Sequence, residues 1–419
     1  MHRLMQGIMA HIIESKEIPI GLGPYSNAIS INDFIFISGT LGFNRKKTTA
    51  GMQDGKPTLT PQIDQIFNTF KGIYKSLGTD AINLLKMNAY LSSWDQYNNL
   101  SSSLQSHLSK MPAISVNGHG LINNGFLAEI DCIGTTSNNI KVIKIPGFTH
   151  FANAPAAIQM GDYIFLSGFA GVDKNGKVVK KGDIQAQTKQ ALEWVKIALE
   201  QAGATPKDVV KNHTTIVDWR DFDQYNAIYA EFYGEPYPTR ASIQGTLSDP
   251  DKLIEFDVIA IINQKKQYVD TAIRGQYQTN INRKNVHLDN RLTPGVAPHC
   301  AGIRTDDFIS ISGMVATDLD GELIGPGDIK AQTKAIMDGI TYALETLGST
   351  SDDIVKSIVS LVDWRHYEEF NKIYESYFTP PYPTRTAFQG GLAQYGLMIE
   401  IEVFAIPNAK KIGTYIIGA

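Results

Sequence analysis

Gly182-Asp-Ile-Gln-Ala-Gln-Thr-Lys189 returns further along the chain as Gly327-Asp-Ile-Lys-Ala-Gln-Thr-Lys334. Two other segments recur in the same way: Val217-Asp-Trp-Arg220 as Val362-Asp-Trp-Arg365, and Pro236-Tyr-Pro-Thr-Arg240 as Pro381-Tyr-Pro-Thr-Arg385. The later copy begins 145 residues after the earlier one in all three cases, at 327 against 182, 362 against 217 and 381 against 236. A constant offset over three separate motifs indicates that a whole structural unit is repeated.

The repeated unit also occurs, more weakly, near the start of the chain. All copies share a strand ending in Ser-Gly, a tryptophan followed by an asparagine, and an acidic triplet. The strand pattern occurs at Phe36-Ile-Ser-Gly39, Phe165-Leu-Ser-Gly168 and Ile309-Ser-Ile-Ser-Gly313. The tryptophan and asparagine are Trp94 with Asn98, Trp219 with Asn226 and Trp364 with Asn371, and the first pair is three residues closer together than the others. The acidic triplets are Glu129-Ile-Asp131, Glu255-Phe-Asp257 and Glu400-Ile-Glu402. We interpret the chain as three copies of a module of roughly 120 residues.

The composition indicates a globular chain with several domains. Of its 419 residues 43% are hydrophobic and 19% are charged, which supplies apolar material for sizeable cores and too little charge for a disordered chain. The formal net charge is −4, so the protein has no overall basic field to attract a phosphate backbone. We therefore expect no nucleic-acid partner.

Cysteine and histidine usage bears on compartment and cofactors. Cys132 and Cys300 lie far apart in the sequence, which disfavours a disulfide framework or a cysteine metal site and favours a reducing, cytoplasmic location. The nine histidines show no His-x-x-x-His spacing, so neither a metal nor another cofactor is expected. Because no run of about 18 apolar residues occurs and the N-terminal stretch lacks a small-residue cleavage site, we predict no membrane span and no signal peptide.

The second copy shows the expected order of elements most clearly. Residues 162–167 predict a strand, and Asp183 and Gly203 are suitable first and last residues for a helix with a 3.6-residue apolar period. Copy one has Thr60 followed by Pro61 at the corresponding helix start. Strands over 209–217 and 253–262, with a helix over 222–233 between them, complete the order β, α, β, α, β. Each copy is thus predicted to be an α+β module with two helices on a mixed sheet.

Five motifs of the module together resemble one known family. They are Gly23-Pro-Tyr-Ser26, the Phe-x-Ser-Gly strands, the Asn-x-x-Tyr of the second helix, the Pro-x-Arg that follows it, and the final Glu-x-Asp/Glu strand. The family is RidA, also called YjgF, the reactive enamine/imine deaminases. The resemblance implies a chorismate-mutase-like fold. Because members of that family usually assemble as homotrimers with pockets between subunits, it also implies an intramolecular pseudo-trimer here.

The domain boundaries follow from the repeats. Module 1 is expected over 1–137, module 2 over 143–263 and module 3 over 292–408, with a polar linker at 264–291 and a C-terminal tail at 409–419. The polar stretch from Asn263 to Arg291 is expected to be a solvated connector rather than an RNA-binding arm, because its only aromatic residues are Tyr268 and Tyr277. We expect a monomer and leave further oligomerisation open.

The resemblance implies catalytic roles for four residues. Arg240 and Arg385 occupy the family's arginine position, and a planar guanidinium can hold a substrate carboxylate by two hydrogen bonds. Glu255 and Glu400 stand in apolar strands, and we expect them to place water or transfer a proton. Two structural alternatives stay open, namely a salt bridge of the arginines at a module interface and a buried ion pair between the glutamates and the arginines.

The resemblance also implies substrate contacts at three further sets of positions. They are Ser38, Gly39, Ser167, Gly168, Ser312 and Gly313 at the strand ends; Asn98, Asn226 and Asn371 on the second helix; and a position held by Tyr25 in copy one, Ala154 in copy two and His299 in copy three. Copy one has Ile114 at the arginine position, although Glu129 remains. Its site is expected to be inactive or to bind an uncharged molecule. A complete set could form where Tyr25 meets an arginine from the neighbouring module.

These residues lead to a functional hypothesis. We expect a cofactor-free hydrolase of the enamine/imine deaminase type, acting on small carboxylate-bearing intermediates such as 2-aminoacrylate or 2-imino acids. Specialisation for one biosynthetic or catabolic pathway stays open. The alternatives are a non-catalytic small-acid-binding or scaffold protein, a chorismatase-like hydrolase, and an endoribonuclease, a label that some family members carry. The acidic charge balance disfavours the last of these.

Overall fold

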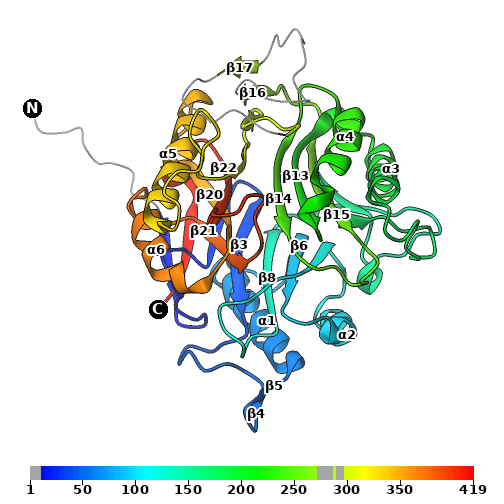
Figure 1. The fold of residues 1–419 in the computed structure, drawn as a ribbon. Coiled ribbons are helices and arrows are strands. Elements are labelled where there is room, and N and C mark those ends of the chain that lie inside the picture. The colour runs from blue at the N-terminus through cyan, green and yellow to red at the C-terminus, as the bar shows by residue number, and fades with distance from the viewer. Residues whose placement is uncertain (1–10, 271–285, 289–296) are drawn as a thin grey trace, which may run out of the picture.

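The structure is a computed structural model that describes residues 11–270, 286–288 and 297–419. In this part of the chain the three modules each form a large mixed sheet covered by two long helices. The helices lie on the outside and the sheets face one another in the middle, with module 1 at the bottom of the view, module 2 on the right and module 3 on the left (Figure 1). No helix among the described residues has the length and apolar character needed to cross a membrane.

Module 1 contains helices α1 and α2 and a sheet that includes one strand from the far end of the chain. Its elements are β1 His11–Ser15, β2 Ala28–Ile31, β3 Phe34–Leu41, β4 Met52–Gln53, β5 Lys56–Pro57, α1 Leu59–Ser76, β6 Asn83–Leu91, α2 Tyr97–His107, β7 Ala113–Gly118, β8 Ala128–Thr135 and β23 Thr414–Gly418. The strands of the sheet are ordered β1-β23-β2-β3-β8-β6-β7, with β6 parallel to β7.

Modules 2 and 3 repeat this arrangement. Module 2 contains β9 Lys141–Ile143, β10 Ala157–Met160, β11 Tyr163–Leu166, β12 Phe169–Ala170, α3 Ile184–Ala202, β13 Val209–Ile216, α4 Phe222–Tyr233, β14 Thr239–Gln244 and β15 Ile254–Ile261. Module 3 contains β16 Gln267–Asp270, β17 Val286–Leu288, β18 Gly302–Arg304, β19 Ile309–Met314, α5 Ile329–Thr346, β20 Ile354–Leu361, α6 Tyr367–Glu375, β21 Thr384–Gln389 and β22 Ile399–Ala405. A short helix, α7 Ala409–Ile412, precedes β23.

The helix ends follow from local side-chain chemistry. The Asp183 carboxylate accepts a hydrogen bond from the backbone N–H of Ala186 at the start of α3, and Gly203 ends the helix with a φ of 80°, as predicted. The prediction for α1 was wrong. Its N-cap is Thr58 rather than Thr60, and the Thr58 hydroxyl donates to the carbonyl oxygen of Gly51 instead of capping the helix.

The strand that carries the arginine position was not predicted in any of the modules. The segments after the Pro-Thr pairs of modules 2 and 3 do not form only a turn, because they continue directly into β14 and β21. These strands pair in parallel with β13 and β20, which places Arg240 beside Asn212 and Arg385 beside Ser357. The corresponding strand of module 1, β7, places Ile114 beside Met87. The arginine position therefore lies on a sheet edge that is held at a fixed register.

The predicted linker and tail are corrected by the structure. Within the linker, β16 pairs antiparallel with β18, and Val269 is fully buried. Within the tail, β23 lies between β1 and β2 in the sheet of module 1, where Ile416 is fully buried. Burying these apolar side chains stabilises both segments as strands. The strands β9, β16 and β23 each follow one module and complete the sheet of the next, so the last strand returns to the first module.

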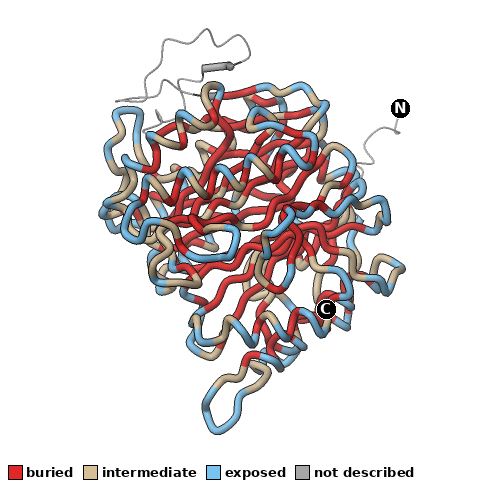
Figure 2. The backbone as a smooth tube through the Cα atoms, turned by 90° about the vertical axis from the view of Figure 1, so that its right-hand side faces the viewer, coloured by how far each residue is buried: buried red, intermediate tan, exposed pale blue. Residues whose placement is uncertain are grey.

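A shared apolar core explains why the strands are apolar on both faces. One buried cluster combines side chains from all three sheets, among them Phe34 and Phe36 of module 1, Phe165 of module 2, and Phe308 and Phe404 of module 3. A separate cluster in each module packs the opposite sheet face against the helices. Strands that are covered on both sides are expected to be almost continuously apolar. The buried strands fill the interior in Figure 2, and exposed segments lie mainly in the outer loops.

Equivalent hydrogen bonds join the modules in cyclic order. The Ser167 hydroxyl accepts from the backbone N–H of Ile114, and that of Ser312 accepts from Arg240, each at 2.9 Å. The Ser38 hydroxyl accepts from the backbone N–H of Arg385, also at 2.9 Å. Module 1 thus contacts module 2, module 2 contacts module 3, and module 3 contacts module 1. We refer to these contact regions as the 1/2 seam, the 2/3 seam and the 3/1 seam.

Candidate active site

The guanidinium of Arg240 is buried at the 2/3 seam. Its side chain extends from β14 over aromatic rings of α4, with the guanidinium carbon 4.9 Å from the centre of the Tyr229 ring and 5.4 Å from that of Tyr225. Its Nη1 donates to the Oδ1 of Asn226 at 2.6 Å. Because Asn226 is itself fully buried, it holds the guanidinium in one orientation.

Arg385 has an equivalent position at the 3/1 seam. Its guanidinium carbon lies 5.0 Å from the ring centre of Tyr374 on α6 and 5.4 Å from that of Tyr25, which belongs to module 1. Its Nη2 donates to the hydroxyl of Tyr367 at 2.9 Å, whereas its Nη1 is buried without a partner. A Cβ at Gly23 would lie 2.6 Å from Nη2. The loop before Tyr25 can approach the guanidinium this closely because Gly23 has no side chain.

Neither arginine forms the structural salt bridge that the sequence left open. Arg240 is 5% exposed and Arg385 is 2% exposed, yet no carboxylate within the described part of the chain lies within 4.0 Å of either guanidinium. The aromatic faces offset part of the cost of burying the charge. A buried cation without an ionised partner remains costly, so each of these sites is suited to bind an anion.

Each buried arginine shares its seam with a buried glutamate from the next module. At the 2/3 seam this residue is Glu400, and a Cβ at Gly313 would lie 2.0 Å from its Oε1. At the 3/1 seam it is Glu129, which approaches Gly39 in the same way, at 1.9 Å. Both glycines are therefore required by the carboxyl groups packed against them. Neither Oε1 could occupy its position beside a larger side chain.

Burial changes the protonation of these glutamates. It raises the pKa of Glu400 to about 8, with Glu402 adding to the effect, and Lys211 and Arg240 partly offset it. It raises the pKa of Glu129 to about 8 as well, with Asp131 adding to the effect and Lys356 and Arg385 opposing it. Both carboxyls are accordingly mostly neutral at pH 7. A neutral carboxyl does not form the ion pair with arginine that the sequence left open.

The pairing of glutamates with arginines differs from the expectation. Glu255, predicted to act with an arginine, lies instead at the 1/2 seam, where Gly168 packs against its carboxyl group and Ile114 holds the arginine position. Glu129, which had no predicted catalytic role, accompanies Arg385. The repeat pattern Glu-x-Asp identified Glu129 as an equivalent of Glu255 and Glu400. The cyclic order of the modules, which decides the partner, cannot be read from the sequence.

The 1/2 seam has an apolar interior. Ile114 and Ala154 belong to one buried cluster, with Phe151 packed against it. The backbone N–H of Gly168, which was predicted to contact a substrate, donates to the carbonyl oxygen of Ile114 at 2.9 Å. Burial raises the pKa of Glu255 to about 7. Among the described residues this seam has a carboxyl group but no guanidinium at the position of Arg240 and Arg385 to hold a substrate carboxylate.

The serines and asparagines that were predicted to bind substrate make different kinds of contact in the structure. The hydroxyls of Ser38, Ser167 and Ser312 each donate to a carbonyl oxygen of their own module at 2.6 Å and accept the seam hydrogen bond described above. They therefore join modules, and those of Ser38 and Ser312 also position the backbone of an arginine. Asn226 accepts a hydrogen bond from the Arg240 guanidinium and so orients it. Asn371 lies beside Gly23, near Arg385.

Asn98 is exposed, and its predicted equivalence to Asn226 was wrong. The error arose from an assumed deletion in copy one. Helix α2 begins three residues after Trp94, just as α4 begins three residues after Trp219, so no residues are missing between the tryptophan and the helix. The position equivalent to Asn226 is Ser101.

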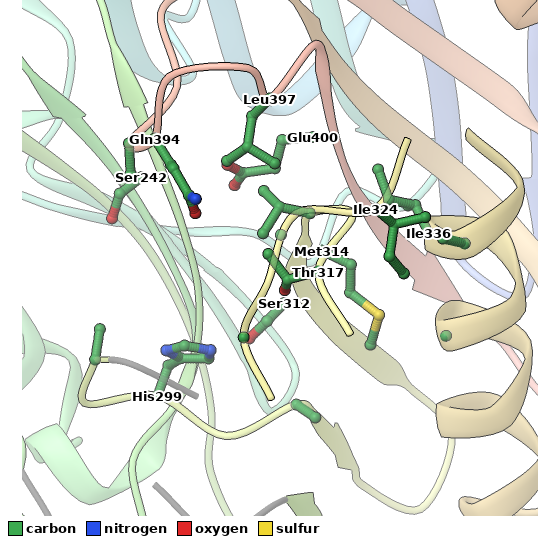
Figure 3. A pocket seen from close by; sticks show the side chains of 18 of the residues that line it. Ser242, His299, Ser312, Met314, Thr317, Ile324, Ile336, Gln394, Leu397 and Glu400 are labelled. Atoms are coloured by element: carbon green, nitrogen blue, oxygen red, sulfur yellow. The ribbon is translucent and has the colours of Figure 1, made fainter. Parts of the chain in front are cut away.

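A cavity of about 470 Å³ opens beside Arg240 at the 2/3 seam. Figure 3 shows Glu400 on one side of it, His299 and Ser242 on the side of module 2, and Ser312 between them. Burial lowers the pKa of His299 to about 3, and the nearby Arg240 acts in the same direction. His299 is therefore neutral at pH 7 and can donate from one ring nitrogen and accept at the other.

Three buried lysines beside these sites were not predicted. Lys86 forms an ion pair with Asp257 at 2.9 Å, Lys356 forms one with Asp131 at 3.0 Å, and Lys211 pairs with Glu402. Each pair joins two modules. The acidic partner stands two residues after the glutamate of its seam, so each lysine also helps to set the charge near that glutamate. A lysine inside each apolar strand was the available signal, because an unpaired lysine is rarely buried.

The described residues contain no group of three or more His, Cys, Asp or Glu side chains that could hold a metal ion. The groups that the structure brings together at the 2/3 and 3/1 seams are a guanidinium, a carboxyl, and either an imidazole or a phenol.

Comparison with known proteins identifies the module. The family described as Endoribonuclease L-PSP matches residues 16–136, 150–262 and 290–407. The 3-aminoacrylate deaminase RutC of Acinetobacter baylyi is 39% identical over 122 residues, which cover 29% of this chain and 97% of that protein. A RutC family protein of Pyrococcus horikoshii is 41% identical over 105 residues, which cover 25% of this chain and 82% of that protein.

Solved structures give matches of the same extent. RidA from the Antarctic bacterium Psychrobacter sp. is 27% identical and matches 29% of this chain and 99% of its own, with a TM-score of 0.28. The YjgF gene product of E. coli is 28% identical and matches 29% of this chain and 99% of its own, with a TM-score of 0.27. The three family matches together span most of the sequence. The chain therefore belongs to the endoribonuclease L-PSP family, also known as the RidA family, and contains three tandem copies of its module.

Proposed function

We propose that this protein is an enamine/imine deaminase that converts 2-imino acids and 2-amino-enoic acids into 2-oxo acids and ammonia. The observation that carries the proposal is that two buried guanidiniums, those of Arg240 and Arg385, have no carboxylate within 4.0 Å in the described part of the chain. A substrate carboxylate would supply the missing anion. The deaminase name of the Acinetobacter relative supports the same reaction class.

The neutral glutamates suit the proton transfers of this reaction. The overall change is R–C(=NH)–COO⁻ + H₂O → R–CO–COO⁻ + NH₃. As the water oxygen bonds to C2, the C=N electron pair moves to nitrogen, which takes the carboxyl proton of Glu129 or Glu400, and the added water returns a proton to that carboxylate. The carboxyl then protonates the amino group, ammonia leaves with the C–N electrons, and the hydroxyl proton restores the carboxyl as C=O forms.

The three seams are proposed to differ in activity. The 3/1 seam combines Arg385 and Glu129 with Tyr25, the family's full set. The 2/3 seam combines Arg240 and Glu400 with His299. The 1/2 seam has Ile114 at the arginine position and is proposed to be inactive. Because each site takes residues from two modules, we also propose that the linked chain acts as an intramolecular equivalent of a trimer. Its sites would then form independently of protein concentration.

An assay in which a second enzyme generates the imines in the reaction mixture tests the proposed reaction. A pyridoxal-phosphate-dependent lyase generates 2-aminoacrylate or 2-iminobutanoate, and the rate of 2-oxo acid release is measured with and without the protein. We expect acceleration by the native protein and by Arg220→Met, a matched control because Arg220 is exposed and paired with Asp218. Binding of 2-oxobutanoate without any acceleration would instead support a binding or scaffold role and would refute the proposed activity.

A further inference from the structure

The cavity at the 2/3 seam extends well beyond the groups that would hold the reacting atoms. Its polar end contains Arg240, His299 and Glu400, and the rest is lined largely by apolar side chains. Figure 3 shows Met314, Ile324 and Ile336 next to helix α5, on the side away from His299 and Ser242. At about 470 Å³ the cavity has the size of pockets that enclose substantial organic ligands. A 2-imino acid with a methyl side chain would leave most of this apolar region in contact with water.

The equivalent positions at the 3/1 seam have different side chains. Met314 follows Gly313 as Thr40 follows Gly39. Ile324 and Ala50 occupy the same place in the loop before the helix, because their backbone N–H groups donate to equivalent carbonyl oxygens, those of Ala316 and Gly42. The apolar side chains of Met314 and Ile324 are therefore specific to module 3 and do not follow from the fold that the modules share.

A third difference concerns the position of Leu397. Leu397 lines the 2/3 cavity, and its N–H donates to Gln394 just as the N–H of Phe126 donates to Asn123 in module 1. Phe126 belongs to another buried cluster and packs against Phe43, with 6.1 Å between the ring centres. The larger ring thus packs into a separate cluster in module 1, whereas Leu397 lies beside Glu400 in the wall of the cavity in module 3 (Figure 3).

We infer that the 2/3 seam takes 2-imino acids whose side chain is large and apolar, of the size of a leucine or phenylalanine side chain. This inference rests on the proposed deaminase function and specifies the substrate of one of its two sites. Arg240 holds the carboxylate, Glu400 faces the imine carbon, and the side chain lies among Met314, Ile324 and Leu397. Each methylene placed in an apolar pocket changes the specificity of an enzyme by about 10-fold or more. The 2/3 seam is therefore expected to favour the leucine-derived imine over 2-iminopropanoate by about 100-fold or more.

The experiment isolates this seam. An amino-acid oxidase generates the imines of leucine, phenylalanine and alanine, and kcat/KM is measured with the Arg385→Met variant, in which only the 2/3 seam retains an arginine. The double substitution Met314→Thr with Ile324→Ala installs the residues found at the 3/1 seam. It is expected to lower kcat/KM for the leucine and phenylalanine imines by about 10-fold or more, with less than about 2-fold change for 2-iminopropanoate. Urea unfolding of both proteins checks that the substitutions leave the fold intact.

Product binding provides a readout that does not depend on turnover. Calorimetry compares 4-methyl-2-oxopentanoate with pyruvate on the same two proteins, and we expect the larger acid to bind more tightly only while Met314 and Ile324 are present. Equal kcat/KM values and equal affinities for large and small acids would overturn the inference while leaving the deaminase function in place. Absence of turnover with every imine, together with tighter binding of the larger acid, would refute the proposed function and retain the apolar acid site.

Discussion

The guanidinium of Arg385 faces the ring of Tyr25 at the 3/1 seam, with 5.4 Å between the guanidinium carbon and the ring centre. The two residues belong to different modules, one near each end of the chain. The Tyr25 hydroxyl accepts a hydrogen bond from the backbone N–H of Leu22 at 2.9 Å, which fixes the ring in place. The first module therefore contributes to a site whose arginine comes from the third.

This contact predicts a seam-specific effect of Tyr25→Ala. In the Arg240→Met background, where only the 3/1 seam retains an arginine, we expect deaminase kcat/KM to fall by about 10-fold, because a buried cation–π contact contributes about 1–2 kcal/mol. In the Arg385→Met background the same substitution should leave the remaining activity within about 2-fold. His299→Ala should show the reverse dependence on background. Equal losses in both backgrounds would contradict the assignment of residues to seams.

The raised pKa values of the glutamates predict how activity depends on pH. The pKa of Glu129 and that of Glu400 are raised to about 8, chiefly by burial, and the neutral carboxyl is the form that donates a proton to the imine. The deaminase rate should accordingly fall as pH rises through about 8. Glu129→Gln in the Arg240→Met background should abolish turnover without lowering the affinity for 2-oxobutanoate. A rate that rises steadily above this pH would contradict the proton-donor role.

The same pKa values predict how stability depends on pH. The folded protein holds a proton on Glu400 up to about pH 8, whereas an unfolded glutamate loses it near pH 4.3. Between these values the folded state binds more protons, so the free energy of unfolding falls as pH rises, by about 1.4 kcal/mol per pH unit for each such carboxyl. This stability is fully present below about pH 4.3 and is lost as pH rises through about 8.

Urea unfolding across this pH range measures the slope. Glu400→Gln should make the decline in stability shallower, because the amide does not titrate. The exposed Glu368→Gln is the matched control and should leave the slope unchanged. Identical slopes for the native protein and Glu400→Gln would show that this carboxyl does not carry a raised pKa in the folded state.

The ion pairs between modules predict a large loss of stability when one partner is removed. Lys356 and Asp131 are each 1% exposed, so Lys356→Met leaves a buried carboxylate without its cationic partner at the 3/1 seam. We expect the free energy of unfolding to fall by about 3–5 kcal/mol, measured by urea denaturation. The double variant Lys356→Met with Asp131→Leu should recover much of that loss.

An exposed pair provides the control for this experiment. Lys75 and Glu17 form an ion pair at 2.6 Å, with both side chains more than half exposed. Lys75→Met should change the free energy of unfolding by no more than about 1 kcal/mol. If Lys356→Met were equally mild, the buried pairs would not hold the modules together.

The last strand of the chain predicts a dependence of module 1 on the C-terminus. Ile416 on β23 is fully buried, whereas Ile412, just before this strand, is 57% exposed. Ile416→Ala should lower the free energy of unfolding by about 2–5 kcal/mol, and Ile412→Ala should change it by no more than about 0.5 kcal/mol. Thermal or urea unfolding measures both. Equal effects would show that β23 contributes no more than an unstructured tail.

Local chemistry made much of each module predictable. The repeated motifs predicted the module and its family. Asp183 and Gly203 predicted the two ends of α3, and the Pro-Thr-Arg motifs identified the two arginines of the site. β14 and β21 escaped prediction because their Pro-Tyr-Pro starts resemble turns. β16 and β23 escaped because polar neighbours hide short apolar runs. The partner of each arginine depends on which module follows which in space. That order is a tertiary property, and so the prediction placed Glu255 and Glu400, rather than Glu129 and Glu400, with the two arginines.

The most direct test of the account is the deaminase rate of three arginine variants in the assay with 2-iminobutanoate. Replacing a guanidinium that binds the substrate carboxylate by a charged hydrogen bond costs about 1.5–3 kcal/mol per bond, so Arg240→Met with Arg385→Met should lower kcat/KM by at least about 100-fold. Each single variant should retain the activity of the other seam. Full activity in the double variant would contradict the claim that these buried guanidiniums hold the acid.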